Sequence, residues 1–310
     1  MSMPVGRFGG VATAMVTPFD DTGALDLDGA ATLARWLADN GSDALIVAGS
    51  TGEATALSDD EKIDLWRCVA EAVTVPVVAG AGTADTRHSI ELTRAASAAG
   101  AAGILAVTPY YSRPAQAGLE AHFRAVAAAT DLPVVLYDIP VRTGRRIAAE
   151  VILRLAAEVP NIVAVKDATG DPAGAARLVA DAPAGFELYS GDDGLTLPLL
   201  AVGACGVISV ASHWCGRAMR AVVDAFMSGD VDGARRINAT LLASFRYESG
   251  DAAPNPVPTK AMMRVLGLPA GQCRLPLGGA PPGLEEEARS LLAALGERAP
   301  AGVGAARHGG

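Results

Sequence analysis

Cysteine and histidine are scarce in this chain, and neither is arranged as a metal site or a disulfide framework. Of 310 residues, four are cysteines and four are histidines. No cysteine lies in a C-x-x-C pair or at ligand spacing from a histidine, and no H-E-x-x-H pattern occurs. We therefore expect no protein-bound metal. The cysteine usage is typical of thiols in a reducing compartment.

Clusters of positive charge are also missing. The chain has 25 Lys and Arg against 34 Asp and Glu, a net charge of −9, with no basic run suited to nucleic acid. No basic and apolar segment precedes residues 12–14, which excludes a signal peptide. The apolar stretch 195–216 is broken by Pro198 and His213, which favours a buried helix and strand over a membrane span. We expect a cytoplasmic protein that binds neither nucleic acid nor membrane.

What the chain has instead is a regular alternation of short apolar runs and longer amphipathic runs. The apolar runs occupy residues 12–17, 43–49, 75–82, 103–109, 133–140, 162–168, 186–191 and 206–212. The amphipathic runs occupy 27–40, 58–73, 86–100, 117–130, 148–159, 172–182, 195–203 and 216–229. Such uniformly apolar strands are typical of a parallel sheet, and their alternation with helices indicates βαβ units.

Eight such units predict an α/β fold, a (β/α)₈ TIM barrel over residues 1–230. A doubly wound sheet is the competing fold, but the closest G-x-G-x-x-G match, "AGAGTADT", lacks its last glycine. Residues 231–298 contain three helical runs with no strand between them and predict a C-terminal helical domain. Residues 299–310 are expected to be a disordered tail.

Two helix starts have capping signals. Ser58 and Glu61 form an S-x-x-E capping box ahead of the second helix. Asp28 is the expected cap of the first barrel helix.

The chemistry of such a barrel lies at the carboxyl ends of its strands. The residues there with usable side chains or backbone are Ser50, Thr51, Glu53, Thr108, Tyr110, Tyr111, Tyr137, Arg142, Lys166, Asp167, Ser190, Gly191, Asp192, Asp193, Ile208 and Ser209. The turn Gly49-Ser50-Thr51-Gly52 follows a strand and precedes a helix, an arrangement that binds an anion through backbone N–H groups.

Lys166 is the most informative of these residues, because it ends an otherwise apolar strand. A buried lysine is costly unless it is paired or has a lowered pKa. An unprotonated amine can attack a carbonyl to give an imine; the alternative is a structural ion pair with Asp167. Three of the five tyrosines, Tyr110, Tyr111 and Tyr137, fall in the same loops. They can relay the protons that imine formation requires, or they can be packed rim aromatics.

Six motifs occur in order along the chain: "GSTGE", "TPYYSRP", "YDIPVRTG", "VKDATG", "YSGDD" and "GVISV". Together they resemble the pyruvate-dependent class I aldolase family of dihydrodipicolinate synthase and N-acetylneuraminate lyase, over residues 8–297. The resemblance implies a TIM barrel with a C-terminal helical domain and a homotetramer built as a dimer of dimers. It implies no cofactor beyond pyruvate itself, bound covalently as an imine.

The resemblance also implies roles for the catalytic residues. Lys166 is similar to the Schiff-base lysine, and Tyr137 to the tyrosine that relays protons to and from the imine. Ser50 is similar to the hydroxyl that links two tyrosines. Tyr111 resembles the second tyrosine, which reaches across the tight dimer into the neighbouring site.

Five further positions match the family's substrate-binding residues. Thr51, with the backbone N–H groups of Ser50 and Thr51, resembles the cradle for the pyruvate carboxylate, and Gly49 is the substrate-binding position before it. Gly191 and Ile208 match backbone positions near the lysine.

Arg142 resembles the arginine that holds the carboxylate of a small acidic aldehyde. It favours the synthase branch, in which pyruvate and L-aspartate-4-semialdehyde give 4-hydroxy-tetrahydrodipicolinate for lysine and diaminopimelate biosynthesis. The alternatives are a related aldolase or lyase acting on N-acetylneuraminate, a 2-keto-3-deoxy sugar acid or 4-hydroxy-2-oxoglutarate, and a non-catalytic binding paralogue.

Three positions depart from the synthase pattern, in two features. Ser50 stands where synthases usually have threonine; it keeps the hydroxyl and loses only the methyl group that stiffens χ1. Lys62 and His88 stand where lysine-inhibited members tend to carry histidine and glutamate. Basic residues there disfavour a cationic effector, so we expect weak or absent inhibition by lysine.

Overall fold

Eight parallel strands close into a barrel at the centre of the molecule. The computed structural model describes residues 6–250 and 253–296. Each strand pairs in parallel with its neighbour in the chain, and the last closes on the first, which confirms the predicted TIM barrel. The strands are β1 (Val11–Ala14), β2 (Ala44–Val47), β3 (Val77–Gly80), β4 (Gly103–Val107), β5 (Val134–Asp138), β6 (Ile162–Asp167), β7 (Glu187–Ser190) and β8 (Gly206–Ser209).

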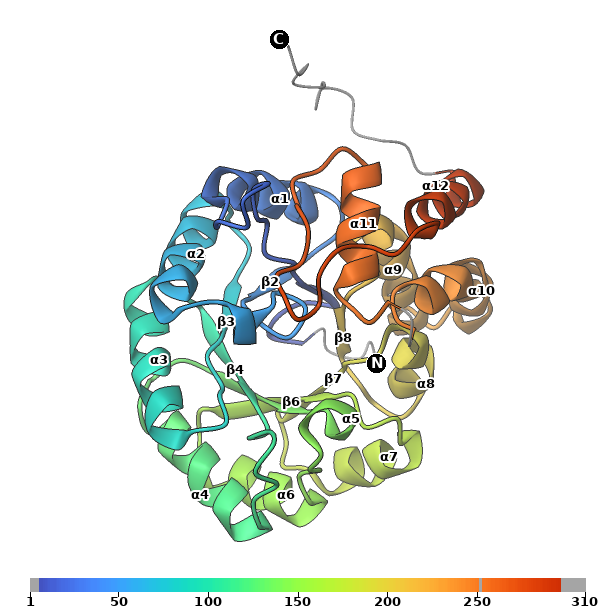
Figure 1. Ribbon diagram of the computed structural model, residues 1–310. Helices are drawn as coiled ribbons and strands as arrows, with labels where there is room; N and C mark the ends of the chain where they lie inside the picture. The colour runs from blue at the N-terminus through green and yellow to red at the C-terminus, as the bar shows by residue number, and fades with distance from the viewer. Residues whose placement is uncertain (1–5, 251–252, 297–310) are drawn as a thin grey trace.

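A ring of helices surrounds the barrel (Figure 1). They are α1 (Leu27–Asp39), α2 (Asp59–Ala72), α3 (Thr86–Ala98), α4 (Gln116–Ala127), α6 (Ala149–Glu158), α7 (Pro172–Asp181), α8 (Thr196–Ala201) and α9 (Ser212–Met227). Three short helices lie in the loops that follow strands: η1 (Ala54–Ala56), α5 (Pro140–Thr143) and η2 (Asp193–Leu195). Of these, α5 was not anticipated, so Arg142 lies on a single helical turn rather than in an irregular loop.

Alternation along the strands separates an inner apolar cluster from an outer one. In β5 and β6, Val135 and Ala164 belong to the cluster inside the barrel. Their neighbours Leu136 and Val165 belong to the cluster between strands and helices. Since successive side chains of a strand point to opposite faces, both faces are buried, as the uniformly apolar runs predicted.

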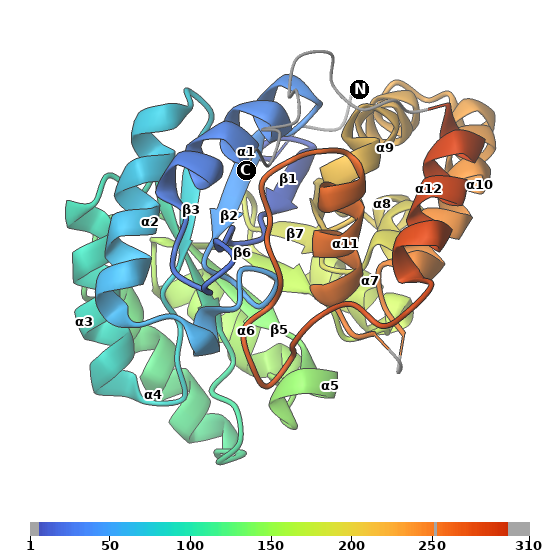
Figure 2. The ribbon, with the colours of Figure 1, turned by 45° about the horizontal axis from the view of Figure 1, so that its top comes forward.

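Helices alone follow the barrel in the described part of the C-terminal region. They are α10 (Val231–Tyr247), α11 (Val257–Val265) and α12 (Leu284–Leu295), which confirms the helical character predicted for this region. α10 and α11 pack against α9, on one side of the barrel (Figure 2). The domain boundary at residue 230 stays a prediction, and the tail predicted over 299–310 lies outside the described residues.

The segment between α11 and α12 returns across the barrel before α12 begins (Figures 1 and 2). Within α11, Lys260 forms a fully buried ion pair with Glu53, with 2.6 Å between Nζ and Oε1. In the returning segment, the backbone N–H of Arg274 donates to Glu53 Oε2 at 2.8 Å. The Arg274 guanidinium lies over the Phe19 ring and pairs with Glu61. The turn after β2 is thus anchored to the C-terminal region.

The two capping predictions had different outcomes. The Ser58–Glu61 capping box is present. The assignment of Asp28 was wrong, because α1 begins at Leu27 and the cap is the residue before it. Asp26 has extended backbone angles, and its carboxylate accepts the N–H of Gly29 at 2.8 Å. Asp28 lies inside the first turn, where its charge still suits the helix dipole.

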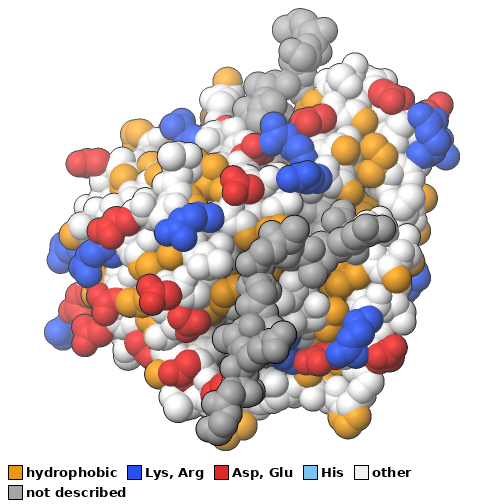
Figure 3. Space-filling model, turned by 90° about the horizontal axis from the view of Figure 1, so that it is seen from above, with side chains coloured by type: hydrophobic (Ala, Val, Ile, Leu, Met, Phe, Trp, Pro, Cys, Tyr) orange, Lys and Arg blue, Asp and Glu red, His pale blue; other side chains and the backbone are white. Residues whose placement is uncertain are grey.

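The apolar stretch 195–216 forms α8 and then β8, as expected for a buried helix and strand. Among the described residues, no helix is long and apolar enough to cross a membrane. On the face seen in Figure 3, acidic and basic side chains are interspersed over the described surface.

Candidate functional site

Lys166 projects into the barrel near the end of β6. It has the same strand parity as Ala164, which lies in the inner cluster. The ladder places it between Tyr137 of β5 and Tyr189 of β7. Its side chain is buried, and the residue is only 4% exposed.

The chain has only three lysines, and all three are buried. Lys62 pairs with Asp59 at 3.4 Å, and Lys260 pairs with Glu53 at 2.6 Å. Lys166 alone has no carboxylate within ion-pair distance among the described residues. The expected alternative of a structural pair with Asp167 is therefore not observed.

The environment of Lys166 favours the free amine. Burial lowers its pKa from 10.5 to about 8; the Asp193 carboxylate opposes this shift, and the Arg142 guanidinium adds to it. The Asp167 carboxylate does not pair with the lysine; its Oδ1 accepts a hydrogen bond from the backbone N–H of Thr169 at 2.8 Å. A substantial fraction of neutral amine is then present near neutral pH, as a nucleophilic lysine requires.

The Tyr137 side chain lies directly against the lysine. Lys166 Nζ is 4.3 Å from the centroid of the Tyr137 ring. Burial raises the pKa of Tyr137 to about 12, although Arg142 and a hydrogen bond with Ser50 act in the other direction. The phenol therefore keeps its proton at neutral pH, and the expected proton relay through Ser50 stays a prediction.

A cavity of about 300 Å³ opens at the carboxyl ends of β2 to β5. It brings together six of the residues singled out in the sequence: Gly49, Ser50, Glu53, Tyr110, Tyr137 and Arg142. The backbone N–H groups of Ser50 and Thr51 donate to no acceptor among the described residues, which leaves them available to an anion.

Thr51 is tied to a residue that the sequence reasoning missed. Asn255 lies in the proline-rich stretch before α11, and its Nδ2 donates to Thr51 Oγ1 at 3.0 Å. Its backbone carbonyl accepts a hydrogen bond from Arg142 Nη2 at 3.0 Å, and its Oδ1 accepts one from Thr259 at 3.1 Å. One asparagine thus connects the turn after β2 with the arginine after β5. In the sequence, Asn255 is marked only by the proline that follows it, a pair that indicates a turn and not a binding residue.

Gly191 and Ile208 lie around the lysine rather than on the cavity wall. A Cβ atom on Gly191 would come within 3.0 Å of Lys166 Cγ. The backbone N–H of Gly191 donates to Asp167 O at 2.7 Å, so the glycine allows β6 and the turn after β7 to approach closely. Ile208 is buried in the inner cluster with Tyr137.

Tyr111 is directed away from the cavity of its own chain. It is 95% exposed and has a left-handed backbone with φ of 69°. A non-glycine residue in this region is strained, and such residues persist where the surroundings hold them. Its neighbour Tyr110 lines the cavity instead. A single chain therefore does not place Tyr111 beside Lys166.

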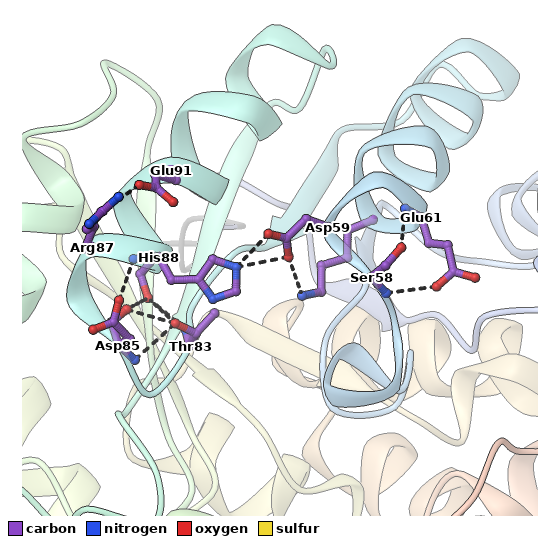
Figure 4. Close-up of polar contacts among 10 residues, drawn as sticks. Ser58, Asp59, Glu61, Thr83, Asp85, Arg87, His88 and Glu91 are labelled. Atoms are coloured by element: carbon purple, nitrogen blue, oxygen red, sulfur yellow. Dashed lines mark hydrogen bonds and ion pairs between the residues drawn. The ribbon is translucent and has the colours of Figure 1, made fainter.

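Lys62 and His88 both contact the carboxylate of Asp59, and Figure 4 shows the His88 ring directed toward that carboxylate. His88 Nε2 lies 2.8 Å from Asp59 Oδ2, and Lys62 Nζ lies 3.4 Å from Asp59 Oδ1. Lys62 lines the cavity, as does Arg274. The basic side chains on this outer wall of the cavity are already paired, Lys62 with Asp59 and Arg274 with Glu61.

No group of three or more His, Cys, Asp or Glu side chains within residues 6–250 and 253–296 is arranged to hold a metal ion. The residues gathered around Lys166 instead supply an amine, a phenol, hydroxyls and a guanidinium. Such a set suits addition to a carbonyl compound that carries a carboxylate.

Comparison with known proteins agrees with this chemistry. The model of the dihydrodipicolinate synthetase family matches residues 7–295. The 4-hydroxy-tetrahydrodipicolinate synthase of Moorella thermoacetica is 52% identical over 94% of this chain and 98% of its own, and that of Bacillus subtilis is 44% identical over 94% and 99%. The crystal structure of the Cyanidioschyzon merolae enzyme with lysine bound superposes with a TM-score of 0.91, at 44% identity over 94% of this chain and 99% of its own.

The burial of Lys166 predicts a measurable cost in stability. With its pKa lowered from 10.5 to about 8, the unfolded chain binds the proton more tightly than the folded one, at a cost of roughly 3 kcal/mol. This cost is fully present below pH 8 and fades as the pH rises towards 10.5. Lys166→Met should therefore raise the thermal midpoint at pH 7, with a gain that shrinks above pH 8.

Lys260→Met is the matched control for this measurement. It leaves Glu53 buried without its partner, so it should lower the midpoint. Equal destabilisation by both substitutions would contradict the assignment of Lys166 as the unpaired lysine.

Proposed function

This chain belongs to the dihydrodipicolinate synthetase family and is a lyase of the 4-hydroxy-tetrahydrodipicolinate synthase type, and we propose that it works through an imine on Lys166. The reaction condenses pyruvate with L-aspartate-4-semialdehyde, and the family's enzymes need no cofactor. The observation that carries the proposal is the buried lysine without an acid partner, with the Tyr137 ring 4.3 Å from its amine. The proposal includes a cytoplasmic location.

Pyruvate binding uses the turn after β2. The N–H groups of Ser50 and Thr51 have no acceptor among the described residues, so they receive the pyruvate carboxylate. The Thr51 hydroxyl accepts its hydrogen bond from Asn255, which leaves its own proton free to donate to the same anion. Gly49 lets the ligand approach the backbone closely. The carbonyl carbon then lies within reach of Lys166.

The covalent steps follow from the two side chains in contact. The neutral Lys166 amine adds to the pyruvate carbonyl to give a carbinolamine. The phenol of Tyr137 gives a proton to its hydroxyl group, which leaves as water when the imine forms. The resulting imine makes the methyl group acidic, and the phenolate with Ser50 takes up its proton. The enamine attacks the aldehyde. The substrate's own amine then closes the ring and displaces Lys166.

Borohydride trapping tests this mechanism directly. With pyruvate, the wild-type protein should gain one reduced pyruvyl group on the Lys166 peptide, read by peptide mass spectrometry. Lys166→Ala should gain none, because no other lysine is both buried and unpaired. Lys62→Arg is the control and should still be labelled on Lys166. A missing adduct, or one on Lys62 or Lys260, would overturn the proposal.

Arg142 is proposed to hold the carboxylate of the aldehyde substrate. Arg142→Ala should raise the KM for aspartate semialdehyde by about 10- to 100-fold, since a charged hydrogen bond contributes about 1.5–3 kcal/mol. It should also raise the pKa of Lys166, because Arg142 lowers it, so trapping at pH 7 should slow.

Arg142→Lys separates the two effects. It keeps the charge and loses the bidentate fork, so it should raise the KM and leave trapping at pH 7 nearly unchanged. Activity against a panel of other aldehydes serves as the specificity control. An unchanged KM in Arg142→Ala would assign aldehyde binding elsewhere.

Tyr111 is proposed to complete the active site of a partner chain within a homotetramer of tight dimers. Its 95% exposure in the single chain is what supports this proposal. Tyr111→Phe and Lys166→Ala should each be nearly inactive alone. When the two variants are unfolded and reassembled together, mixed dimers contain one intact site, so activity should return. Failure of complementation, with mixed dimers verified by mass spectrometry, would place Tyr111 in its own site.

Weak or absent inhibition by L-lysine is the expected regulatory behaviour. The outer wall has Lys62 and His88 on the one carboxylate of Asp59, so a second cation would meet like charge. Initial rates should be unaffected by low-millimolar lysine. The combined substitution Lys62→His and His88→Glu should create sensitivity. Inhibition of the unmodified protein in that range would contradict the expectation.

A further inference from the structure

Two buried carboxyl groups contact each other beside the proposed imine site, outside the cavity. Asp193 begins η2, directly after β7, and is 2% exposed. Glu248 follows α10 and is 8% exposed. α10 packs against η2, and the Glu248 carboxyl hydrogen-bonds to that of Asp193. Neither residue lines the cavity, and the mechanism above uses neither.

The hydrogen bonds around the pair leave one oxygen of each carboxyl group without a donor. Asp193 Oδ2 accepts the backbone N–H groups of Val210 and Ala211 at 2.7 and 2.9 Å. The other oxygen, Oδ1, and Oε2 of Glu248 are buried without a donor among the described residues. Two ionised carboxylates in contact would repel, and each would lose its hydration. A proton on Glu248 removes the repulsion and lets one carboxyl donate to the other.

The carboxyl pair lies close enough to Lys166 for its charge to affect the pKa of the amine. Gly191, two residues before Asp193, lies close to the lysine stem, because a Cβ atom added to it would come within 3.0 Å of Lys166 Cγ. Asp193 is the strongest charge acting on the lysine amine, and it favours the protonated amine. Burial and Arg142 favour the neutral amine.

Three other charged or titratable groups among the described residues act on this pair or on the lysine. Asp192 adds negative charge near Glu248. His213 of α9 is fully buried, which lowers its pKa to about 4 and leaves it uncharged at neutral pH. Arg142 adds positive charge near the lysine. None of the three donates a hydrogen bond to Asp193 Oδ1 or Glu248 Oε2. A proton held between the two carboxyl groups is therefore still needed to satisfy these oxygens.

We infer that Asp193 and Glu248 share one proton and act as positioning residues that hold a single negative charge beside Lys166. If both carboxyl groups were ionised, their two charges would keep the Lys166 amine protonated. If neither were ionised, the amine would be too weak a base to take its proton back. The single charge sets the pH at which free amine becomes available. This inference rests on the proposed imine chemistry at Lys166.

The pH dependence of borohydride trapping tests the inference. Glu248→Gln replaces the shared proton with an amide N–H and keeps one negative charge, so the acid limb of the trapping rate should not move. Adding Asp193→Asn removes the charge and should move that limb down by about one pH unit. The exposed Glu71→Gln is the control and should leave the profile unchanged. A shift in Glu248→Gln equal to that of the double variant, or no shift in the double variant, would overturn the inference.

Thermal unfolding gives a second measurement that does not depend on activity. Burial and Asp193 raise the pKa of Glu248 well above 4.5, so folding takes up a proton above that pH and stability falls as the pH rises. Glu248→Gln should therefore raise the midpoint at pH 8 and not at pH 4. A lower midpoint at pH 8 would mean that Glu248 is ionised.

The two proposals fail in different ways. If the wild-type protein gives no adduct, the proposed function fails. If the adduct forms and the double variant keeps the wild-type pH profile, only the role of the carboxyl pair fails.

Discussion

The burial of Lys166 without a partner is the constraint on which the rest of the site depends. The amine sits inside the barrel beside an inner apolar cluster that includes Ala164, Tyr137 and Tyr189, so its charged form is disfavoured. The other two lysines show that the fold can pair a buried amine, since Asp59 and Glu53 do so. Lys166 has no carboxylate within ion-pair distance among the described residues, which is the property that the proposed imine chemistry requires.

The C-terminal region is part of the site rather than an appendage to it. Asn255 bonds to Thr51 and Arg142, which lie after different strands. The buried Glu53–Lys260 pair holds the same turn from the other side. Side chains that bind two reacting molecules must be kept in fixed relative positions. These contacts fix Thr51 and Arg142 from outside the barrel. The same C-terminal region also contains Glu248, at the end of α10.

Much of the fold was predictable because the physical signals are local. The eight apolar runs and the capping box at Ser58 depend only on neighbouring residues, and the structure confirms them. Asp28 was misassigned because several acids could cap the same helix, and only the backbone angles select Asp26. The short helix at Arg142 was missed because a four-residue turn has no hydrophobic period to read.

The sequence by itself determined the barrel, the lysine at the end of β6 and the polar residues at the carboxyl ends of the strands. These follow from alternation and from the position of charge within apolar runs. Only the tertiary structure decided which buried lysine is unpaired, that Asn255 joins Thr51 to Arg142, and that Asp193 meets Glu248. Such contacts join residues far apart in the chain, 204 residues in the case of Asn255 and Thr51. Their energies depend on burial and close approach, which no local pattern encodes.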